Sequence, residues 1–531
     1  MKRLTAQVRA SEGVAIGRAF VVRRETGVAV QSQGDTASEC TLFREALQAS
    51  DRQIEELAAT DDIFAAHLEM VRDDMLRESV EGHIAEGASA LAAVEQSAEE
   101  IAAMFEMLDD EYLRERAADV RDIFARIAAN LTGGVRNPFE GLAEGDVVVG
   151  EALLPSDVAM MPLRSVAALV TAEGGATSHV CIIARSRSIP AVVGLGGAVA
   201  EISHGATIVV DGSVGEVIIE PDEATLEEYR ARIALCEAER ATDREAVGLT
   251  LKDAEGRAIS VRANAGSVEQ VREAIAGGAD GVGLLRSEFL YMLSDAEPTE
   301  QLLVEQYTAA AEACGGRVLT IRTLDVGGDK PLPYMTLPKE DNPFLGWRAI
   351  RISLVEREMF ARQLRAILRA SAVGGVRVMF PMVCSLGELR EAKALLEECK
   401  GELRAEGVPF DEGIPVGVMI ETPAAVFIAR ELAAECDFFS IGTNDLTQYV
   451  MAADRANVRV AALCNPLSEA VLAAVRMTVE AAAEAGIECC CCGEVASDAD
   501  ATAELLACGL RSLSVSGSVV GRIKRRIAKL I

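Results

Sequence analysis

The sequence predicts a multidomain α/β protein, in which an α/β domain carries an inserted α-helical bundle and is followed by a C-terminal (β/α)8 TIM barrel. Three observations lead to this prediction. The chain has 531 residues, enough for about three or four domains of ordinary size. One long block has helical periodicity and is flanked on both sides by strand-like runs. The second half of the chain alternates strand-like and helix-like segments.

The composition narrows the range of partners. The chain has 52 Lys and Arg against 83 Asp and Glu, a formal net charge of −31. Such a charge repels phosphate backbones, so we expect no nucleic-acid partner, whereas a basic protein surface would be attracted. No apolar run reaches the ~18 to 20 residues of a membrane helix, and residues 1–9 lack the apolar core of a signal peptide. We therefore expect a cytoplasmic protein with no membrane segment and with reduced cysteines.

The α/β domain is expected to comprise residues 1–36 and 138–221. Its expected strands are short β-branched runs between glycine-rich turns, at residues 17–22, 27–30, 146–149, 167–171, 191–193, 207–210 and 217–219. Because these runs lie on both sides of the helical block, residues 37–137 are predicted to be an insertion into the domain.

The insertion is predicted to be a helical bundle. Its apolar residues recur at spacings of three and four, as at Ile54, Leu57, Leu68 and Val71, with almost no Gly or Pro between them. Pro221 then ends the series of strand-like runs. Residues 222–250 are predicted to form a charged helical linker.

The barrel is expected over residues 251–531. Its expected strands are residues 258–263, 281–285, 318–324, 376–382, 416–420, 438–441, 488–492 and 512–515. A doubly wound sheet is the structural alternative. The barrel is favoured because acidic, Arg and Asn residues collect where these strands end, where such barrels place their active sites.

A histidine stands at the start of a predicted helix in the α/β domain. Gly174 and Gly175 allow a tight turn after a strand, and Thr177 and Ser178 can cap the helix that follows, which puts His179 near its N-terminus. Backbone N–H groups and the helix dipole there suit an anion attached to the imidazole, so His179 could carry a phosphoryl group. The alternative is a structural histidine, which we prefer for His67, His83 and His204.

These residues are part of a series of motifs that runs through the chain. The motifs are Gly174–Arg185, Ile189–Gly194, Asp280–Leu290, Arg322–Lys330, Asn342–Arg351, Met419–Ala425, Ser440–Tyr449 and Cys492–Glu494. In this order they resemble the phosphoenolpyruvate-protein phosphotransferases, the enzyme I family of bacterial sugar phosphotransferase systems. The resemblance covers nearly the whole chain and implies a swivelling phosphohistidine domain, a helical insertion that binds the phosphocarrier HPr, and a barrel that binds phosphoenolpyruvate and dimerises.

The resemblance implies a substrate site in the barrel. Phosphoenolpyruvate carries a phosphate and a carboxylate, both of which suit forked guanidinium groups. Arg286 and Arg322 are implied to bind the phosphate, Arg455 and the Asn444–Asp445 region to hold the other end of the substrate, and Arg348 to support the site. For any single arginine the alternative is a surface ion pair.

The resemblance also implies a metal site and a proton donor. Glu421 and Asp445 close two neighbouring predicted strands and are implied to bind Mg²⁺, which prefers few carboxylates and several waters. Cys492 is implied to be the general acid that protonates the enolate carbon as pyruvate forms. On a strand, Cys490 and Cys492 share one face and Cys489 and Cys491 the other, so this run of four cysteines is a poor zinc cage.

The implied reaction has two steps and a second protein. His179 accepts the phosphoryl group of phosphoenolpyruvate, pyruvate leaves, and a histidine of HPr then receives the phosphoryl group, which begins sugar uptake. An acidic surface on the insertion, including Asp61, Asp62, Glu69, Asp73 and Asp74, would attract a basic carrier. The barrel is expected to form a homodimer.

The chain departs from the family pattern near the predicted active histidine, and two rival functions remain to be weighed. The family usually has threonines where this chain has Leu154 and Val158, and the second commonly hydrogen-bonds the active histidine, so the orientation of His179 must rest on another group. One rival is a pyruvate phosphate dikinase or phosphoenolpyruvate synthase, for which no stretch is left to supply a nucleotide-binding domain. The other is a non-catalytic regulator, which would have little need for Glu421, Asp445, Arg322 and Cys492.

Overall fold

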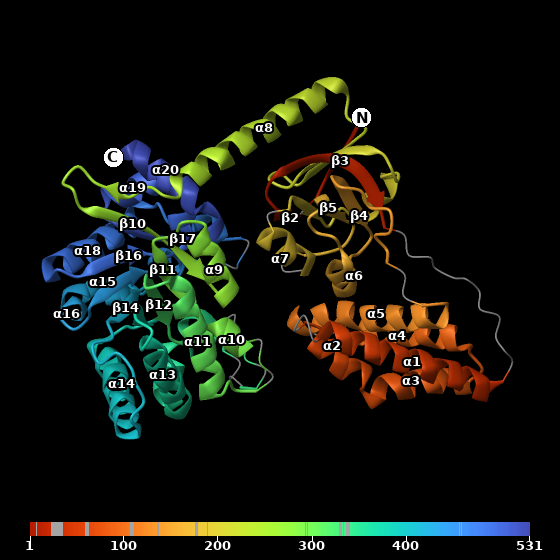
Figure 1. Cartoon of the computed structure of the whole chain (residues 1–531), viewed down its shortest axis with the longest axis horizontal. Helices are drawn as coiled ribbons and strands as arrows, with labels where there is room; N and C mark the ends of the chain where they lie inside the picture. The colour runs from red at the N-terminus through yellow and green to blue at the C-terminus, as the bar shows by residue number, and fades with distance from the viewer. Residues whose placement is uncertain are drawn as a thin grey trace. The chain divides into compact units, whose positions relative to one another are not determined.

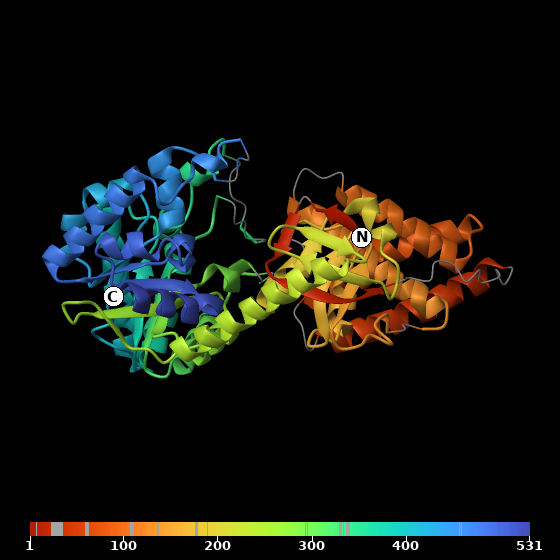
Figure 2. The ribbon, with the colours of Figure 1, turned by 90° about the horizontal axis from the view of Figure 1, so that it is seen from above.

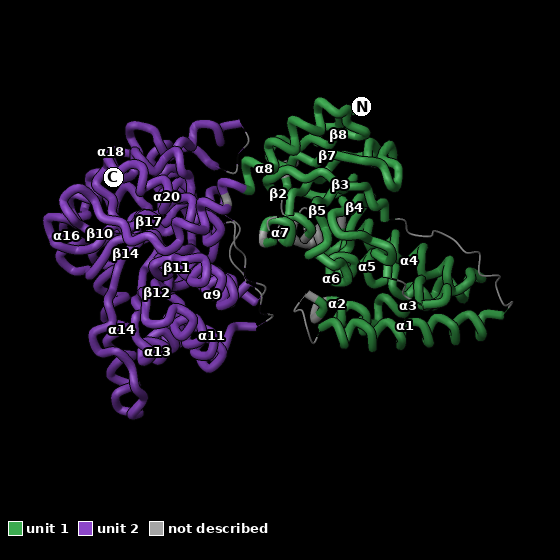
Figure 3. Tube along the Cα trace, turned by 45° about the horizontal axis from the view of Figure 1, so that its top comes forward, with its two compact units in different colours: residues 1–237 green, residues 238–531 purple. Residues whose placement is uncertain are grey.

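The computed structural model divides the chain into two compact units, residues 1–237 and 238–531 (Figure 3). It describes residues 1–6, 8–22, 35–58, 63–106, 111–134, 137–175, 179–187, 189–292, 294, 296–328, 332, 334–335, 340–455, 457 and 459–531. The expected strand at 27–30 and the residues Asp61, Asp62, Thr177 and Ser178 lie outside this set. Within it, no helix combines the length and the apolar character needed to cross a membrane.

Unit 1 contains an eight-stranded sheet with the order β1-β8-β7-β3-β4-β5-β6-β2. Its strands are β1 (Lys2–Thr5), β2 (Val8–Ser11), β3 (Val14–Val21), β4 (Asp146–Gly150), β5 (Val166–Thr171), β6 (Ala191–Val193), β7 (Thr207–Asp211) and β8 (Glu216–Ile219). The strands β3 to β6 run parallel, and their buried Val, Leu and Ala side chains form the core. The β-branched runs therefore form strands where expected, and β1 and β2 are additional edge strands.

The helical insertion lies in the same unit. Its helices are α1 (Thr36–Ala58), α2 (Ile63–Val71), α3 (Asp74–Ala85), α4 (Ala90–Glu106) and α5 (Glu111–Leu131), which Figures 1 and 2 both show as one group. Phe43, Val80 and Phe124 are among the side chains buried between them. The carboxylate of Asp122 on α5 accepts a hydrogen bond from the backbone N–H of Ser156, at 2.9 Å, and so joins the bundle to α6 (Pro155–Met160).

The long helix α8 (Glu223–Ala246) is anchored at both ends but not in its middle. Near its start, Arg232 forms an ion pair with Asp211 of β7, at 2.6 Å. Near its end, Asp243 forms one with Arg525 of α20, also at 2.6 Å. Between them, the described side chains of residues 233–237 make no hydrogen bond or ion pair. This short stretch joins the part of α8 fixed to unit 1 to the part fixed to unit 2.

Unit 2 is a closed barrel of eight parallel strands. The strands are β10 (Ala258–Ala265), β11 (Gly281–Arg286), β12 (Val318–Arg322), β13 (Val376–Phe380), β14 (Val416–Ile420), β15 (Phe438–Ile441), β16 (Glu488–Cys491) and β17 (Ser512–Ser516), with the short β9 (Leu251–Lys252) beside β10. Because β10 pairs in parallel with both β11 and β17, the sheet closes on itself. This closure excludes the doubly wound alternative and confirms the predicted barrel.

Helices connect and surround the strands of the barrel (Figure 1). They are α9 (Val268–Ala276), α10 (Glu288–Met292), α11 (Glu300–Cys314), α12 (Ile350–Val355), α13 (Arg357–Ser371), α14 (Leu386–Glu406), α15 (Pro423–Phe427), α16 (Ala429–Ala433), α17 (Thr443–Met451), α18 (Glu469–Ala485), α19 (Thr502–Ala507) and α20 (Val520–Leu530). The outward-facing strand residues pack against these helices in one large apolar core.

The barrel interior has a charged layer and an apolar layer. At the start of β16, Glu488 accepts hydrogen bonds from Arg262 at 2.8 Å and from Arg377 at 3.1 Å. The guanidinium of Arg377 also lies 4.0 Å from the centre of the Phe438 ring. Phe438 belongs in turn to a small apolar cluster with Leu284, Met379, Met419 and Cys492, which ends directly below the strand termini.

Candidate active site at the carboxyl ends of the barrel strands

The polar residues expected at the site converge because their strands are parallel. Arg286 and Arg322 are the last residues of β11 and β12, and Glu421 directly follows β14. Asp445 lies in the first turn of α17, which follows β15. The carboxyl ends of parallel barrel strands open at one face, so these side chains meet there.

Arg322 is buried between two carboxylates. It donates to Oε1 of Glu288 at 2.5 Å and pairs with Oδ2 of Asp325 at 3.1 Å. Burial disfavours the charge on the guanidinium, but the neighbouring carboxylates outweigh this and raise the pKa of Arg322 above its ordinary value. The sulfur of Met419, a residue of the apolar layer, lies 3.7 Å from Nη1 of Arg322. The guanidinium therefore also contacts that layer.

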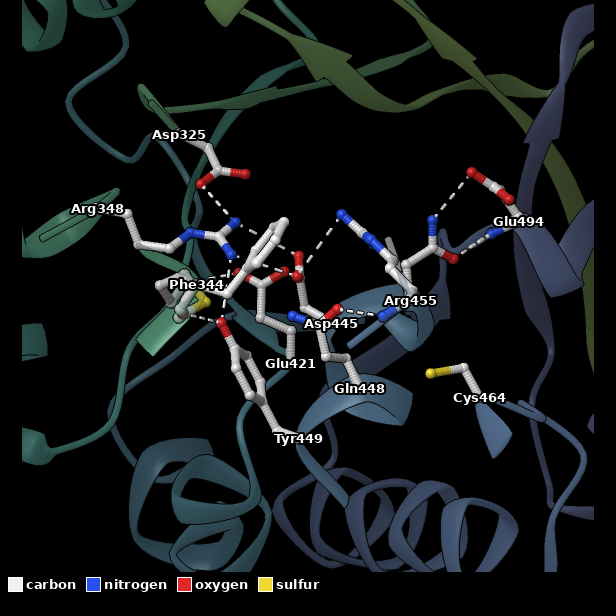
Figure 4. A network of polar contacts seen from close by, with 12 residues as sticks. Asp325, Phe344, Arg348, Glu421, Asp445, Gln448, Tyr449, Arg455, Cys464 and Glu494 are labelled. Carbon is white, nitrogen blue, oxygen red and sulfur yellow. Dashed lines mark hydrogen bonds and ion pairs between the residues drawn. The ribbon is translucent and has the colours of Figure 1, made fainter. Parts of the chain in front are cut away.

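Arg348 joins three other residues of the site (Figure 4). Its guanidinium lies 3.1 Å from Oδ1 of Asp325, 3.3 Å from Oδ1 of Asp445 and 3.2 Å from the hydroxyl of Tyr449. Only 2% of the residue is exposed, so these charges interact with little screening by water. Arg348 therefore holds the loop after β12 and the start of α17 together.

Glu421 is a fully buried carboxylate of the group, with 1% of the residue exposed. It accepts a hydrogen bond from the backbone N–H of Met382 at 2.6 Å. Burial, together with the charges of Asp445 and Asp325, raises the pKa of Glu421 to about 8. Burial is the larger cause, and the two neighbouring carboxylates add to it.

The backbone around this carboxylate is unusually constrained. Met382 has φ of 56° and Ala349, beside Arg348, has φ of 52°, in the region that side chains disfavour. A Cβ added to Gly442 would lie 2.7 Å from Oε2 of Glu421, so only glycine allows the chain to pass so close. Strained backbone of this kind is typical of functional sites.

The outer part of the site contains Arg455, Asn444 and Arg286. Arg455 is about one-third exposed and reaches Oδ1 of Asp445 at 3.9 Å. The Asn444 amide donates to Oε1 of Glu494 at 3.1 Å, while the Glu494 backbone N–H donates to the Asn444 oxygen at 3.0 Å. Arg286 makes no hydrogen bond or ion pair with any residue that the structure describes. Its guanidinium is thus available to a ligand.

The thiol of Cys492 lies just below this polar group. It is 3% exposed and donates a weak hydrogen bond to the carbonyl of Ile441, at 3.6 Å. Burial raises the pKa of the Cys492 thiol to about 12, so it is held in the protonated form that an acid requires. The amide of Asn264 donates to the Cys492 carbonyl at 3.0 Å and fixes the backbone of this residue.

Comparison with known proteins identifies the family. The family models described as PEP-utilising enzyme match the chain in three parts: the PEP-binding domain over residues 240–531, the N-terminal domain over residues 8–116 and the mobile domain over residues 142–215. The chain is 40% identical over 533 residues to the phosphoenolpyruvate-protein phosphotransferase of Bacillus subtilis, which covers 98% of this chain and 93% of that protein. The chain belongs to the phosphoenolpyruvate-protein phosphotransferase family.

Other relatives carry the same name. The proteins of Priestia megaterium and Haemophilus influenzae are 41% and 40% identical to this chain, with 98% of this chain covered and 93% and 92% of the relatives. The expected family is thereby confirmed, and the chain is a phosphotransferase enzyme. The shared name favours this activity over the dikinase and synthase alternatives.

The segment predicted from the sequence to carry the phosphohistidine lies in unit 1. His179 is the first residue of α7 (His179–Ser186), and its side chain lies outside the described part of the chain. The segment that usually contains the family's threonines forms α6, where Val158 is 2% exposed and apolar. The Asp157 carboxylate accepts from the backbone N–H of Leu154 at 2.9 Å, so both replaced positions belong to one ordered turn.

Several polar neighbours of the site were not among the residues singled out from the sequence. They are Glu288, Asp325, Tyr449 and Asn264, which contact Arg322, Arg348 or Cys492. Glu288 lies two residues after Arg286, and Asp325 lies three residues after Arg322, both inside family motifs. This proximity to a predicted site residue was the signal that could have identified them. Asn264 is in no such motif, and only the closed barrel brings it beside Cys492.

Proposed function

We propose that this phosphotransferase moves the phosphoryl group of phosphoenolpyruvate to His179, releasing pyruvate, and then to a histidine of the small carrier HPr. In this proposal the reaction is the first step of sugar uptake by a phosphotransferase system. The observation that carries it is the convergence of Arg322, Arg348 and several carboxylates at the barrel mouth. Cationic forks and a hard-cation site are what a substrate with phosphate and carboxylate groups requires.

The proposed substrate roles are those that the resemblance to the family implies. Arg286 and Arg322 bind the phosphate, and Arg455 with Asn444 and Asp445 holds the other end of the substrate. Arg286 is suited to this because it has no partner among the described residues. Arg348, which pairs with Asp325 and Asp445, supports the site by orienting Asp445.

Mg²⁺ is the proposed cofactor, with Glu421 and Asp445 as its ligands. The donor set fits a hard cation, because the buried Glu421 supplies carboxylate oxygens and has the carboxylates of Asp445 and Asp325 near it. Mg²⁺ is usually bound through one or two carboxylates and keeps several waters, so two protein ligands suffice for the proposal. When bound, Mg²⁺ neutralises charge that develops during phosphoryl transfer.

His179 and Cys492 act in different steps of the proposed reaction. The neutral imidazole of His179 attacks phosphorus, and the arginines hold the phosphoryl oxygens as the enolate leaves. The Cys492 thiol then protonates the enolate carbon, which gives pyruvate. The support for Cys492 is its position below the arginines and its burial as a neutral thiol.

The remaining assignments concern domains and partners. We assign residues 1–36 and 138–221 to a swivelling phosphohistidine domain, 37–137 to HPr binding, 222–250 to a helical linker and 251–531 to substrate binding and dimerisation, in a cytoplasmic homodimer. Glu69, Asp73 and Asp74 on and beside α2 and α3 supply acidic surface for a basic carrier. Phe427 is 76% exposed and Leu345 is 65% exposed, which provides apolar surface on the barrel unit for a second copy.

Labelling with phosphoenolpyruvate tests the central step. The protein is incubated with ³²P-phosphoenolpyruvate and Mg²⁺, and the label is tested for acid lability and base stability. Wild type and His83→Ala should be labelled, and His179→Ala should not. Absence of label on wild type, or full label on His179→Ala, would contradict the proposal. Purified HPr should then remove the label from wild type.

A further inference from the structure

A buried amide contacts the strand ends that carry Arg286 and Arg322. The amide belongs to Gln363 of α13, and only 1% of this residue is exposed. Gln363 lies on the buried face of the helix with Phe360 and Ile367. A polar group in such an apolar setting is costly unless its hydrogen-bonding atoms find partners. The partners of Gln363 therefore indicate which parts of the barrel it holds together.

The amide of Gln363 has three hydrogen-bond partners. Its oxygen accepts from the backbone N–H of Leu324 at 2.9 Å. Its nitrogen donates to the hydroxyls of Ser287 and Tyr307, both at 3.0 Å. Because a backbone N–H can only donate, the amide oxygen must face Leu324, which fixes the orientation of the group. Gln363 thus joins α13 to α11, which contains Tyr307, and to the ends of β11 and β12.

These hydrogen bonds lie where the backbone ladder between β11 and β12 ends. Arg286 and Arg322 are paired in register as the last residues of the two strands, and the ladder is irregular over residues 282–285, just before them. The Ser287 hydroxyl donates to the Arg322 carbonyl at 2.7 Å. Gln363 holds both Ser287 and the chain two residues beyond Arg322. Side-chain hydrogen bonds therefore continue the connection between the strands past the two arginines.

The relative position of the two arginines matters for a phosphate. A phosphate presents its oxygens in a fixed tetrahedral arrangement, so two guanidinium groups can share it only when both are held at matching positions. Arg322 is held by ion pairs with Glu288 and Asp325. Arg286 makes no hydrogen bond or ion pair with any described side chain. Its placement thus depends on its backbone, which the next residue, Ser287, ties to β12.

We propose that Gln363 is a positioning residue for phosphate recognition, because it sets the relative positions of the strand ends that carry Arg286 and Arg322. This inference rests on the proposed role of the two arginines. Gln363 does not contact the ligand itself, since it is buried and both of its amide hydrogens are engaged. Its effect should therefore appear in the affinity for a phosphate-bearing ligand and not in the affinity for a ligand that has only carboxylates.

The test compares these two kinds of ligand. All variants are made in full-length His179→Ala protein, the parent, which should not turn over phosphoenolpyruvate, and binding is measured by calorimetry with Mg²⁺. Gln363→Met and Ser287→Ala should each bind phosphoenolpyruvate about 5- to 10-fold more weakly than the parent, as expected for lost hydrogen bonds. The affinity for oxalate, which has two carboxylates and no phosphate, should change by less than about 2-fold.

Thr478→Val is the matched control for the loss of a buried hydroxyl. Like Ser287, Thr478 is fully buried and donates to a backbone carbonyl, that of Ala474 in its own helix α18, at 2.9 Å. This variant should keep both affinities of the parent. Thermal unfolding checks that every variant is folded before titration. Equal weakening of phosphoenolpyruvate and oxalate binding in Gln363→Met and Ser287→Ala, or no weakening, overturns the positioning role.

Arg286→Ala in the same parent distinguishes failure of this inference from failure of the proposed site. Weaker phosphoenolpyruvate binding in Arg286→Ala, together with normal binding in Gln363→Met and Ser287→Ala, overturns only the role of Gln363. Normal phosphoenolpyruvate binding in Arg286→Ala overturns the assignment of this arginine to the phosphate, and with it the role of Gln363. If Gln363→Met does not fold, Ser287→Ala alone decides between these outcomes.

Discussion

Arg348 shows how much one buried charge can contribute to the stability of the barrel. Replacing it with Met leaves Asp325 and Asp445 buried without their shared cation, and loss of one partner from a buried ion pair typically costs about 3–5 kcal/mol. Arg348→Met should therefore lower the free energy of unfolding of the barrel by about this amount, measured by urea titration. Mg²⁺ should stabilise the variant more than wild type, since a cation can replace part of the lost charge.

An exposed arginine provides the control for this prediction. Arg390 pairs with Glu435, but 63% of its side chain is exposed. Arg390→Met should leave the free energy of unfolding nearly unchanged and should not alter the effect of Mg²⁺, because exposed ion pairs contribute little. An equal loss in both variants would show that burial of Arg348 is not what makes it important.

Some residues of the site could be predicted from the sequence and others could not. Arg322, Glu421 and Asp445 stand at strand ends, so strand assignment and motif order together bring them to one face. Asn264 could not be found in this way, because it lies in no family motif and its position beside Cys492 depends on closure between the first and last strands.

At the scale of elements, the charged layer of β10, β13 and β16 makes stability depend on pH. Burial opposes ionisation of Glu488, but hydrogen bonds and charges from Arg262 and Arg377 outweigh it and lower its pKa to about 2. A lowered folded-state pKa means that the stabilisation is complete above about pH 4.5 and is lost as pH falls towards 2. Glu488→Gln should be clearly less stable than wild type at pH 7, and this difference should shrink below pH 4.

The measurement is urea unfolding of both proteins between pH 3 and pH 7. Glu402→Gln is a suitable control, because Glu402 also pairs with an arginine, Arg365, but its side chain is 60% exposed. Its effect should be small at every pH. A Glu488→Gln difference that stays constant down to pH 3 would contradict the role given to this layer.

The elements themselves were predictable to different degrees. The barrel strands consist mainly of buried apolar residues, interrupted by polar or charged ones such as Arg262, Arg377 and Glu488, and they were located from the sequence to within a few residues. β1 and β2 were not expected, because edge strands carry polar residues, and β1 has only Leu4 buried. Their strand character comes from pairing with β8 and β6.

At the scale of the whole molecule, residues 233–237 of α8 separate the ion pair that Arg232 makes in unit 1 from the one that Asp243 makes in unit 2. Ala234→Pro should break the helix there, since Pro removes a backbone hydrogen bond and clashes with the preceding turn. Each unit should keep its own thermal transition, because the anchoring residues Arg232 and Asp243 are outside this stretch. Phosphorylation by phosphoenolpyruvate should slow, while transfer from phosphorylated protein to HPr should not.

The control uses the same substitution at the start of the helix. Pro is tolerated at the first helical position, so Glu223→Pro should leave both reactions near their wild-type rates. Calorimetry and separate assays of the two half-reactions provide the readouts. Equal loss of both half-reactions in Ala234→Pro would argue against independent movement of the units.

The same stretch of α8 contains a cysteine that is suited to chemical labelling. Of the thirteen cysteines, all of which the structure describes, only Cys236 is exposed. A maleimide fluorophore should therefore attach there preferentially under brief labelling. Its fluorescence anisotropy decay would report the local tumbling of the linker during turnover, without any engineered residue.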